Sequence, residues 1–419
     1  MRCSALIVSG AIAVLLWPTA AIAAGDAEPR LPNPQWRTSP HSRSSAIERG
    51  TSSSPTDVEL PSDAPRATIS PPALPAQPAS FEERCAQPGV VLCDPLDEGR
   101  VRGSGITSRT ANATLPTALK GRYRDWRWCS HVAGVTPPTP IFDDKVKTSG
   151  SGALKFVVPT RSAAADAGYC QINFTPDNSV QFGEGDTFFV QFRVRLSCTL
   201  LFADCDPASQ GYKKERRVYR STDKSVTSFK VSIINAGDHP DLQYPVSSCT
   251  EQHLVLVQGH NGIVAGYHSC GWYDGHAMNV GQEHGSGLWD RQPRKAVGAG
   301  GRCLNRKGNE ALVDCVVWPA DEWVTITQQV TIGKWVSRLD DPTRSSNVRI
   351  WMQRQGEKPV LVIDYDRNLR APEKPFMKYG KIWLLPYMTN KDPLEDHPEA
   401  YMWFDELIVS RSPIAPAPD

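Results

Sequence analysis

The sequence lacks an excess of charge of either sign. It also lacks any apolar run long enough to cross a membrane. It contains 46 Lys+Arg and 45 Asp+Glu. Arg2 lies in an N-terminal stretch that we expect to be removed, so 46 − 1 = 45 bases face 45 acids in the rest of the chain. A nearly neutral chain has no general attraction to nucleic acid or to an anionic membrane. We therefore expect no nucleic-acid partner and no transmembrane segment.

Residues 1–23 have the pattern of a secretory signal peptide. Arg2 supplies the positive start, residues 5–16 are almost all apolar, and Ala21-Ile22-Ala23 offers a small-x-small cleavage pattern. The apolar run is too short for a membrane-spanning helix. We expect an exported protein, either secreted or periplasmic/extracellular.

Residues 24–84 are predicted to be a disordered Pro/Ser-rich spacer. The stretch 24–80 has eleven prolines, many Ser and Thr, and few large apolar residues. Such a segment cannot bury enough surface to offset the entropy lost on ordering. The composition becomes globular from Cys85 onward, so one folded domain is predicted over 85–419.

Motifs that would hold zinc are missing, although cysteine is not. The sequence has no C-x-x-C unit and no H-E-x-x-H unit, which disfavours a zinc site. Of eleven cysteines, Cys3 lies in the signal, and the remaining ten are an even number in an exported protein, which favours disulfides. Three short spacings and one possible hairpin closure predict these pairs: Cys85–Cys93, Cys198–Cys205, Cys303–Cys315 and Cys249–Cys270.

Helical periodicity is also scarce, whereas alternating strands recur along the chain. Phe188–Leu196 alternates Phe and Val with polar side chains, and Val348–Gln353 repeats this pattern. About eleven such segments with Gly/Pro/Asp turns predict an all-β fold. We expect a two-sheet antiparallel β-sandwich, or jelly roll, with long disulfide-stapled loops at 199–225 and 271–315.

Several of these segments, taken in order, resemble the concanavalin A-like lectin/glucanase superfamily. They are G-S-G-A-L-K-F, G-D-T-F-F-V-Q-F-R-V-R-L, E-W-V-T-I-T-Q-Q-V-T-I-G, N-V-R-I-W-M-Q-R-Q-G and W-F-D-E-L-I-V. Within that superfamily the chain most resembles the jelly-roll polysaccharide lyases and their uncharacterised bacterial relatives. The resemblance covers roughly residues 90–412 and implies a carbohydrate-active protein.

The polar positions of the alternating strands are rich in bases, amides and aromatic rings. Flat rings suit the apolar side of a sugar, and amide and guanidinium groups suit hydroxyls and carboxylates. A groove shared by these residues would bind an acidic glycan, whereas a polar convex face would produce the same alternation. The predicted substrate-binding residues are Asn173, Gln191, Arg195, Lys230, Arg349, Trp351, Gln353, Lys381 and Trp383.

The candidate catalytic residues follow from the resemblance to lyases. A glycosidase would need two carboxylates beside the scissile bond, and the E-x-D-x-x-E strand of laminarinase-like enzymes is absent. In the resembling lyases an amide, a His and a Tyr act on a uronate. Their nearest matches here are Gln171, His268 and Tyr387, and Arg193 or Arg195 could bind the carboxylate.

A structural Ca²⁺ is the one cofactor expected. Many folds of the superfamily hold Ca²⁺ with a last-strand Asp, which corresponds to Asp405 here, and Asp94 and Gly152 are possible partners. Asp405 could instead cap the sheet or pair with an Arg.

The sequence therefore predicts a secreted, monomeric lyase that cleaves an acidic, uronate-containing polysaccharide by β-elimination. The alternative is a non-catalytic, lectin-like module tethered by the spacer.

Overall fold

The computed structural model describes residues 74–97, 127–130, 139–175, 178–239, 250, 252–258, 262, 264–268, 272–273, 276–277, 316–337, 345–372 and 374–418. All of them belong to the compact unit Ile69–Asp419, which separates from Met1–Thr68. The predicted signal and most of the predicted spacer lie outside the described residues. Among the described residues, no helix has the length and apolarity needed to cross a membrane.

The first sheet has eight antiparallel strands. Its strands, in spatial order, are β17 (Val360–Arg367), β16 (Ser346–Arg354), β14 (Trp323–Thr331), β6 (Thr187–Leu196), β20 (Ala400–Ser410), β4 (Ala153–Val158) and β3 (Ile141–Asp143), and β1 (Val90–Asp94) pairs with β20 beside this path.

The second sheet has six antiparallel strands. Its spatial order is β11 (Val264–His268), β10 (His253–Gln258), β9 (Lys230–Ala236), β19 (Tyr379–Leu384), β5 (Tyr169–Asn173) and β2 (Arg127–Ser130). Strands far apart in sequence are neighbours in this sheet, since β19 lies between β5 and β9.

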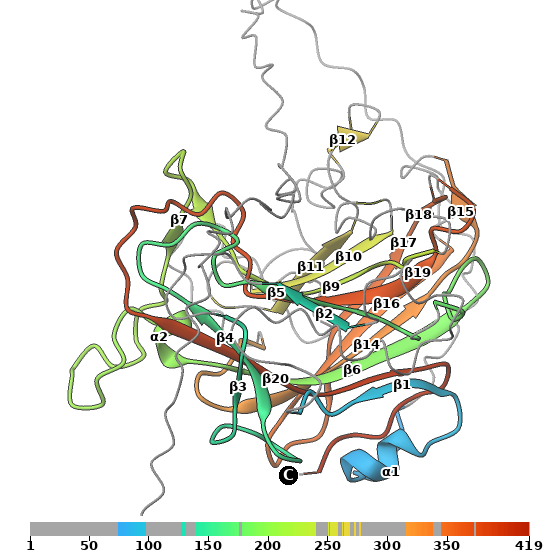
Figure 1. The fold of residues 1–419 in the computed structure, drawn as a ribbon, viewed down its shortest axis with the longest axis horizontal. Coiled ribbons are helices and arrows are strands. Elements are labelled where there is room, and N and C mark those ends of the chain that lie inside the picture. The colour runs from blue at the N-terminus through green and yellow to red at the C-terminus, as the bar shows by residue number, and fades with distance from the viewer. Residues whose placement is uncertain are drawn as a thin grey trace, which may run out of the picture. The chain divides into compact units, whose positions relative to one another are not determined.

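The two sheets stack on each other (Figure 1), and both contribute side chains to one hydrophobic core. Alternate side chains of each strand enter it: Phe188 and Val190 come from β6, and Ile382 comes from β19. The rings of Phe156 and Phe404 meet edge to face with centroids 5.6 Å apart. Alternation buries one side of each strand because successive side chains point to opposite faces. The predicted two-sheet sandwich is confirmed.

The remaining elements are short. They are α1 (Phe81–Cys85), α2 (Cys198–Leu201), β7 (Tyr219–Arg220), β8 (Val226–Thr227), β12 (Trp272–Tyr273), β13 (His276–Ala277), β15 (Trp335–Val336) and β18 (Leu369–Arg370). Among the named strands, β15 and β18 form a parallel pair.

The helix α1 lies beside the predicted domain boundary at Cys85, and the domain bounds stay a prediction. Ser80 and Glu83 form a capping box at the start of α1. Phe81 packs with Phe189 and Ile408 of the eight-stranded sheet and with Ile414, which follows β20. Arg84 is fully buried and forms an ion pair with Glu406 of β20.

Three disulfides lie among the described residues. Cys85–Cys93 and Cys198–Cys205 confirm two predicted pairs, and Cys129–Cys170 joins β2 to β5. The predicted pairs Cys303–Cys315 and Cys249–Cys270 involve cysteines outside the described residues.

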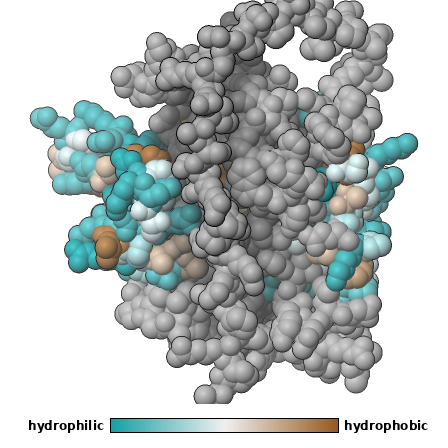
Figure 2. Space-filling model, turned by 90° about the horizontal axis from the view of Figure 1, so that it is seen from above, coloured by the Kyte–Doolittle hydropathy of each residue, from teal (hydrophilic) through white to brown (hydrophobic). Residues whose placement is uncertain are grey.

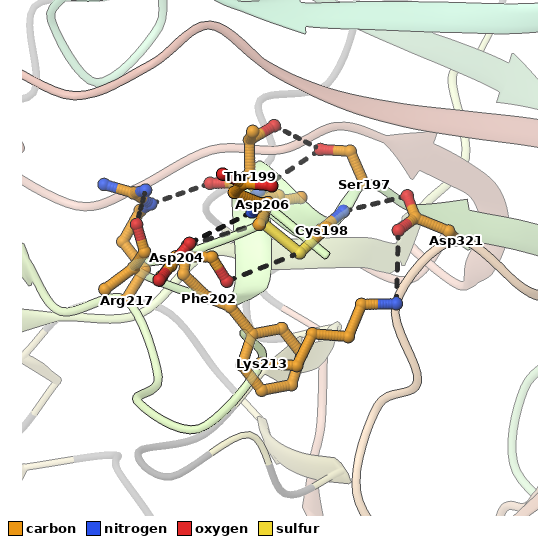
Figure 3. Close-up of a disulfide and its surroundings, with 12 residues drawn as sticks. Ser197, Cys198, Thr199, Phe202, Asp204, Asp206, Lys213, Arg217 and Asp321 are labelled. Atoms are coloured by element: carbon orange, nitrogen blue, oxygen red, sulfur yellow. Dashed lines mark hydrogen bonds and ion pairs between the residues drawn. A yellow bond between two sulfur atoms is a disulfide. The ribbon is translucent and has the colours of Figure 1, made fainter. Parts of the chain in front are cut away.

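Figure 3 shows how one disulfide fixes the start of the 199–225 loop. The Cys198 N–H donates to Asp321 Oδ1 at 2.9 Å, and Lys213 Nζ lies 3.5 Å from Asp321 Oδ2. The loop is thereby fastened to the segment that precedes β14.

The described surface visible in Figure 2 is mostly hydrophilic, with separate hydrophobic spots. Among the described residues, the exposed large apolar side chains are Tyr212, Val218, Val226 and Leu394. Monomeric state stays a prediction.

Candidate functional site

The candidate site is the face of the six-stranded sheet that points away from the shared core. We call it the site face. The register places Ile172, Ile382 and Ile234 in one line across the sheet, and all three belong to the core. The residues between them therefore point to the other side. Its strand residues are Tyr169, Gln171, Asn173, Lys230, Ile233, Asn235, His253, Val255, Val257, Ala265, Tyr267, Lys381 and Trp383.

One line across the site face is polar. It runs Asn173–Lys381–Asn235–His253 across four adjacent strands. Lys381 Nζ lies 2.5 Å from Asp238 Oδ1, and Asn173 Nδ2 donates to Asp238 Oδ2 at 2.8 Å. Burial lowers the pKa of Lys381, while the Asp238 carboxylate opposes that shift. The buried charge of Lys381 is thus matched by a carboxylate inside the protein.

Two glycines allow the strands to approach closely beside this line. A Cβ on Gly380 would lie 2.9 Å from the Gly237 Cα and 2.6 Å from Gln181 Cγ. The register of β19 against β9 shifts between Tyr379 and Lys381, at Gly380. Gly237 precedes Asp238, so this close approach brings the carboxylate toward Lys381.

The neighbouring line is apolar and aromatic. It runs Gln171–Trp383–Ile233–Val255–Tyr267, and these apolar members belong to, or pack against, a cluster separate from the main core. The Trp383 and Tyr169 rings stack with centroids 4.6 Å apart and planes at 24°. A flat aromatic surface next to amide groups suits a pyranose ring.

Lys230 and Tyr387 form a pair at the edge of this apolar cluster. Lys230 Nζ lies 4.6 Å from the centroid of the Tyr387 ring, and the Lys230 N–H donates to the Tyr387 carbonyl at 2.7 Å. Burial lowers the pKa of Lys230 to about 8 and raises the pKa of Tyr387 to about 12. The pair can therefore supply a neutral amine and a protonated phenol at the same pH.

The placement of His268 requires a correction. His268 pairs with Leu254, whose side chain enters the core, so the ring lies on the opposite side of the sheet from Gln171. His253 lies on the site face instead. The sequence could not distinguish the two histidines, because Val and Leu make β10 apolar on both sides.

The predicted shared groove is also corrected, because its residues divide between the two sheets. Gln171, Asn173, Lys230, Lys381 and Trp383 lie on the site face, with Tyr387 beside them. The others lie on the outer face of the eight-stranded sheet, on β6 and β16: Gln191, Arg193, Arg195, Arg349, Trp351 and Gln353.

Three of the residues on the eight-stranded sheet, Gln191, Gln353 and Arg349, have structural partners. Gln191 Nε2 donates to the Ala415 carbonyl at 3.0 Å, and Gln353 Nε2 donates to the Ala417 carbonyl at 2.9 Å. Arg349 Nε lies 3.1 Å from Asp364 Oδ1. Arg193 pairs by register with Asp405 and is separated from Gln171 by the sandwich core. It is therefore not placed to share a ligand with Gln171.

The predicted calcium residues make other contacts. Asp405 Oδ2 accepts from the Thr148 N–H and from its hydroxyl, both at 2.8 Å. The Gly152 N–H donates to Asp97 Oδ1 at 3.1 Å, and Asp94 Oδ1 accepts from the Leu96 N–H at 2.9 Å. The carboxylate oxygens Asp405 Oδ2 and Asp94 Oδ1 thus have hydrogen-bond donors of the protein as partners. Among the described residues, no group of three or more His, Cys, Asp or Glu could hold a metal. Calcium stays a prediction.

Sequence reasoning missed several residues of the site face: Tyr169, Asn235, Asp238, His253 and Tyr267. Asp238 follows β9 by two residues and is not part of any alternating pattern. Tyr169 and Asn235 do alternate with core residues, which was the available signal.

Comparison with known proteins gives structural matches alone. No family model matches the chain, and no curated protein was found to match its sequence. An alginate lyase from Aplysia kurodai aligns with 10% identity over 64% of this chain and 85% of its own, with a TM-score of 0.38.

Two other solved structures give similar values. An alginate lyase from a Chlorella virus aligns with 10% identity over 65% of this chain and 90% of its own, at a TM-score of 0.32. The catalytic domain of a glycoside hydrolase family 131 protein from Coprinopsis cinerea aligns with 14% identity over 76% and 98%, at a TM-score of 0.33. Polysaccharide lyases are thus present among the structural matches, as the resemblance in sequence predicted. Because the sequence identities are so low, this similarity is one of fold only.

Proposed function

We propose that the protein is an exported polysaccharide lyase that binds an acidic glycan on the site face. One observation carries this proposal: Lys230 and Tyr387 lie together beside the line that holds Gln171 and Trp383. These residues supply an amine, a phenol, an amide and a flat ring on one side of one sheet. β-Elimination of a uronate needs such groups, and it needs no pair of carboxylates.

In this proposal each group has one task. The Gln171 amide stabilises the negative charge that develops on the uronate carboxyl group. The Lys230 amine removes the C5 proton. The Tyr387 phenol gives its proton to the glycosidic oxygen as the C4–O bond breaks and the C4–C5 double bond forms. The pKa values of about 8 for Lys230 and about 12 for Tyr387 support this assignment of base and acid.

Hydrolysis is less well supported by the same face. Glycosidases place two carboxyl groups on either side of the scissile bond. Asp238 is the described carboxylate near the polar line, and Lys381 and Asn173 already hold both of its oxygens.

The test is a panel of alginate, glucuronan and glycosaminoglycans, followed by the ultraviolet absorbance of the unsaturated product. Wild type should produce absorbance on at least one polymer. Tyr387→Phe and Lys230→Met should each lower kcat by about 10²-fold or more, which is typical for the loss of an acid or a base.

Two controls match these changes elsewhere in the fold. Tyr212→Phe removes a hydroxyl from an exposed tyrosine. Lys155→Met removes an amine that lies 4.4 Å from the Tyr401 ring on the other sheet. Both controls should retain wild-type turnover. If wild type produces no absorbance on the panel but binds a glycan saturably, the lectin-like alternative replaces the lyase.

A further inference from the structure

Trp383 carries a hydrogen-bond donor for which the described residues supply no acceptor. Its side chain is 8% exposed, and its Nε1 atom is buried without a hydrogen-bond partner among the described residues. An unsatisfied buried donor destabilises a protein, so buried polar groups usually have partners. This donor belongs to the apolar line of the site face.

The indole ring is held in place by its neighbours. It stacks on Tyr169 with centroids 4.6 Å apart, and its strand position is fixed between Gln171 on β5 and Ile233 on β9. The ring cannot turn toward another acceptor without breaking that stack. The N–H therefore stays in a position where the described residues offer it no acceptor.

The neighbouring groups indicate what the ligand atom is. An indole N–H only donates, so the ligand must supply an acceptor. Lys381 Nζ donates to Gln171 Oε1 at 3.3 Å, which fixes the amide oxygen toward the lysine and leaves the amide NH2 as a second donor. The described residues supply no acceptor to that NH2 group. Two adjacent donors suit a carboxylate better than a hydroxyl, because a hydroxyl also needs an acceptor.

We infer that the Trp383 indole N–H donates to the carboxylate of a bound uronate unit and makes Trp383 a residue that determines specificity for acidic sugars. This inference rests on the proposed function and specifies the substrate class of the same site.

The chain offers a matched control in Trp318. Its Nε1 is also buried without a partner among the described residues, but its side chain is fully buried in the sandwich core. Trp318→Phe removes the same N–H where no ligand binds. Both Phe variants keep an aromatic ring, and thermal unfolding checks that both fold.

The experiment measures binding by calorimetry for wild type, Trp383→Phe and Trp318→Phe. The probes are oligosaccharides of the acidic panel polymer that wild type binds best, and the same oligosaccharides after reduction of their carboxyl groups to alcohols. Trp383→Phe should bind the acidic probe about tenfold or more weakly, the range of a lost charge-assisted hydrogen bond. It should bind the reduced probe like wild type. Trp318→Phe should match wild type on both probes.

The inference is overturned if Trp383→Phe binds the acidic probe like wild type, if it loses both probes equally, or if wild type binds no acidic polymer. Its failure is separable from that of the proposed function. A wild type that cleaves while Trp383→Phe retains its affinity overturns the inference alone. A wild type that binds acidic probes through Trp383 without cleaving them overturns the lyase alone.

Discussion

The Lys230 amine lies over the ring of Tyr387, with Nζ 4.6 Å from the ring centroid, and the two residues are also joined by a backbone hydrogen bond of 2.7 Å. Burial disfavours the charged form of each side chain. It therefore shifts the two pKa values in opposite directions, because the charged form of lysine is protonated and that of tyrosine is deprotonated. The pKa of the amine falls to about 8 while that of the phenol rises to about 12. Between these values the amine is neutral and the phenol keeps its proton.

The first prediction concerns activity against pH. Cleavage should rise as pH increases through about 8, because the neutral amine of Lys230 is the base. Lys230→Arg keeps the positive charge but cannot lose a proton at these pH values, so it should lower kcat by about 10²-fold or more. The measurement is kcat/KM from pH 6 to pH 10 (a range of about four units around the pKa). A profile that is flat or falls through pH 8 would contradict this role.

The second prediction concerns stability against pH. The folded pKa of Lys230 lies below its ordinary 10.5, so the unfolded chain binds more protons between about 8 and 10.5. The free energy of unfolding should therefore rise with pH in this window, by roughly 3 kcal/mol in total from this group.

Lys230→Met removes the contribution of this amine. Relative to wild type, the variant should be more stable below pH 8, and its advantage should shrink toward pH 10.5. Urea unfolding at several pH values measures the difference. An advantage that does not change with pH would exclude a depressed pKa at Lys230.

The third prediction concerns Asp405 and calcium. Burial raises the pKa of Asp405 to about 7, so the folded chain holds an extra proton between about 3.8 and 7. Wild type should lose stability as pH rises through this window, and Asp405→Asn should not show this loss.

Calcium titration of the same two proteins tests the cofactor prediction. If Asp405 is a ligand, Ca²⁺ should raise the Tm of wild type at pH 8 and leave Asp405→Asn unchanged. An equal response of the two proteins removes Asp405 from any calcium site.

The fourth prediction concerns the buried ion pair Arg84–Glu406. Arg84 also donates to Gln191 Oε1 at 2.5 Å, so it joins α1 to β6 and β20. Arg84→Ala leaves the Glu406 carboxylate buried without its cation and should cost about 3–5 kcal/mol. The control is Arg161→Ala, which breaks an exposed pair with Asp396 and should cost at most about 1 kcal/mol. Equal losses in urea unfolding would contradict the buried pairing.

The sequence predicted the strands well because alternation marks a half-buried strand directly. β6 is the clearest example: Phe188, Val190 and Phe192 enter the core, and Gln191 and Arg193 point outward, as the pattern indicated. Alternation does not tell which sheet a strand joins. Arg193 and Lys381 therefore looked alike in sequence although they belong to different sheets.

The rest of the site depends on pairing between distant strands. Lys381 and Asp238 are 143 residues apart in sequence. They meet because β19, which contains Lys381, pairs with β9, which ends just before Asp238. His253 and His268 are distinguished by the register of one hairpin, in which a shift by one residue exchanges the two faces. Neither relation is encoded in a local pattern.

The most direct test of the central claim is the mass of the products formed from an acidic polymer by wild type, by Tyr387→Phe and by Lys155→Met. The account predicts that wild type and Lys155→Met release oligosaccharides lighter by one water than hydrolysis products, with the unsaturated sugar at the non-reducing end, and that Tyr387→Phe releases about 10²-fold less. Products that carry the added water, or equal yields from Tyr387→Phe and wild type, would contradict it.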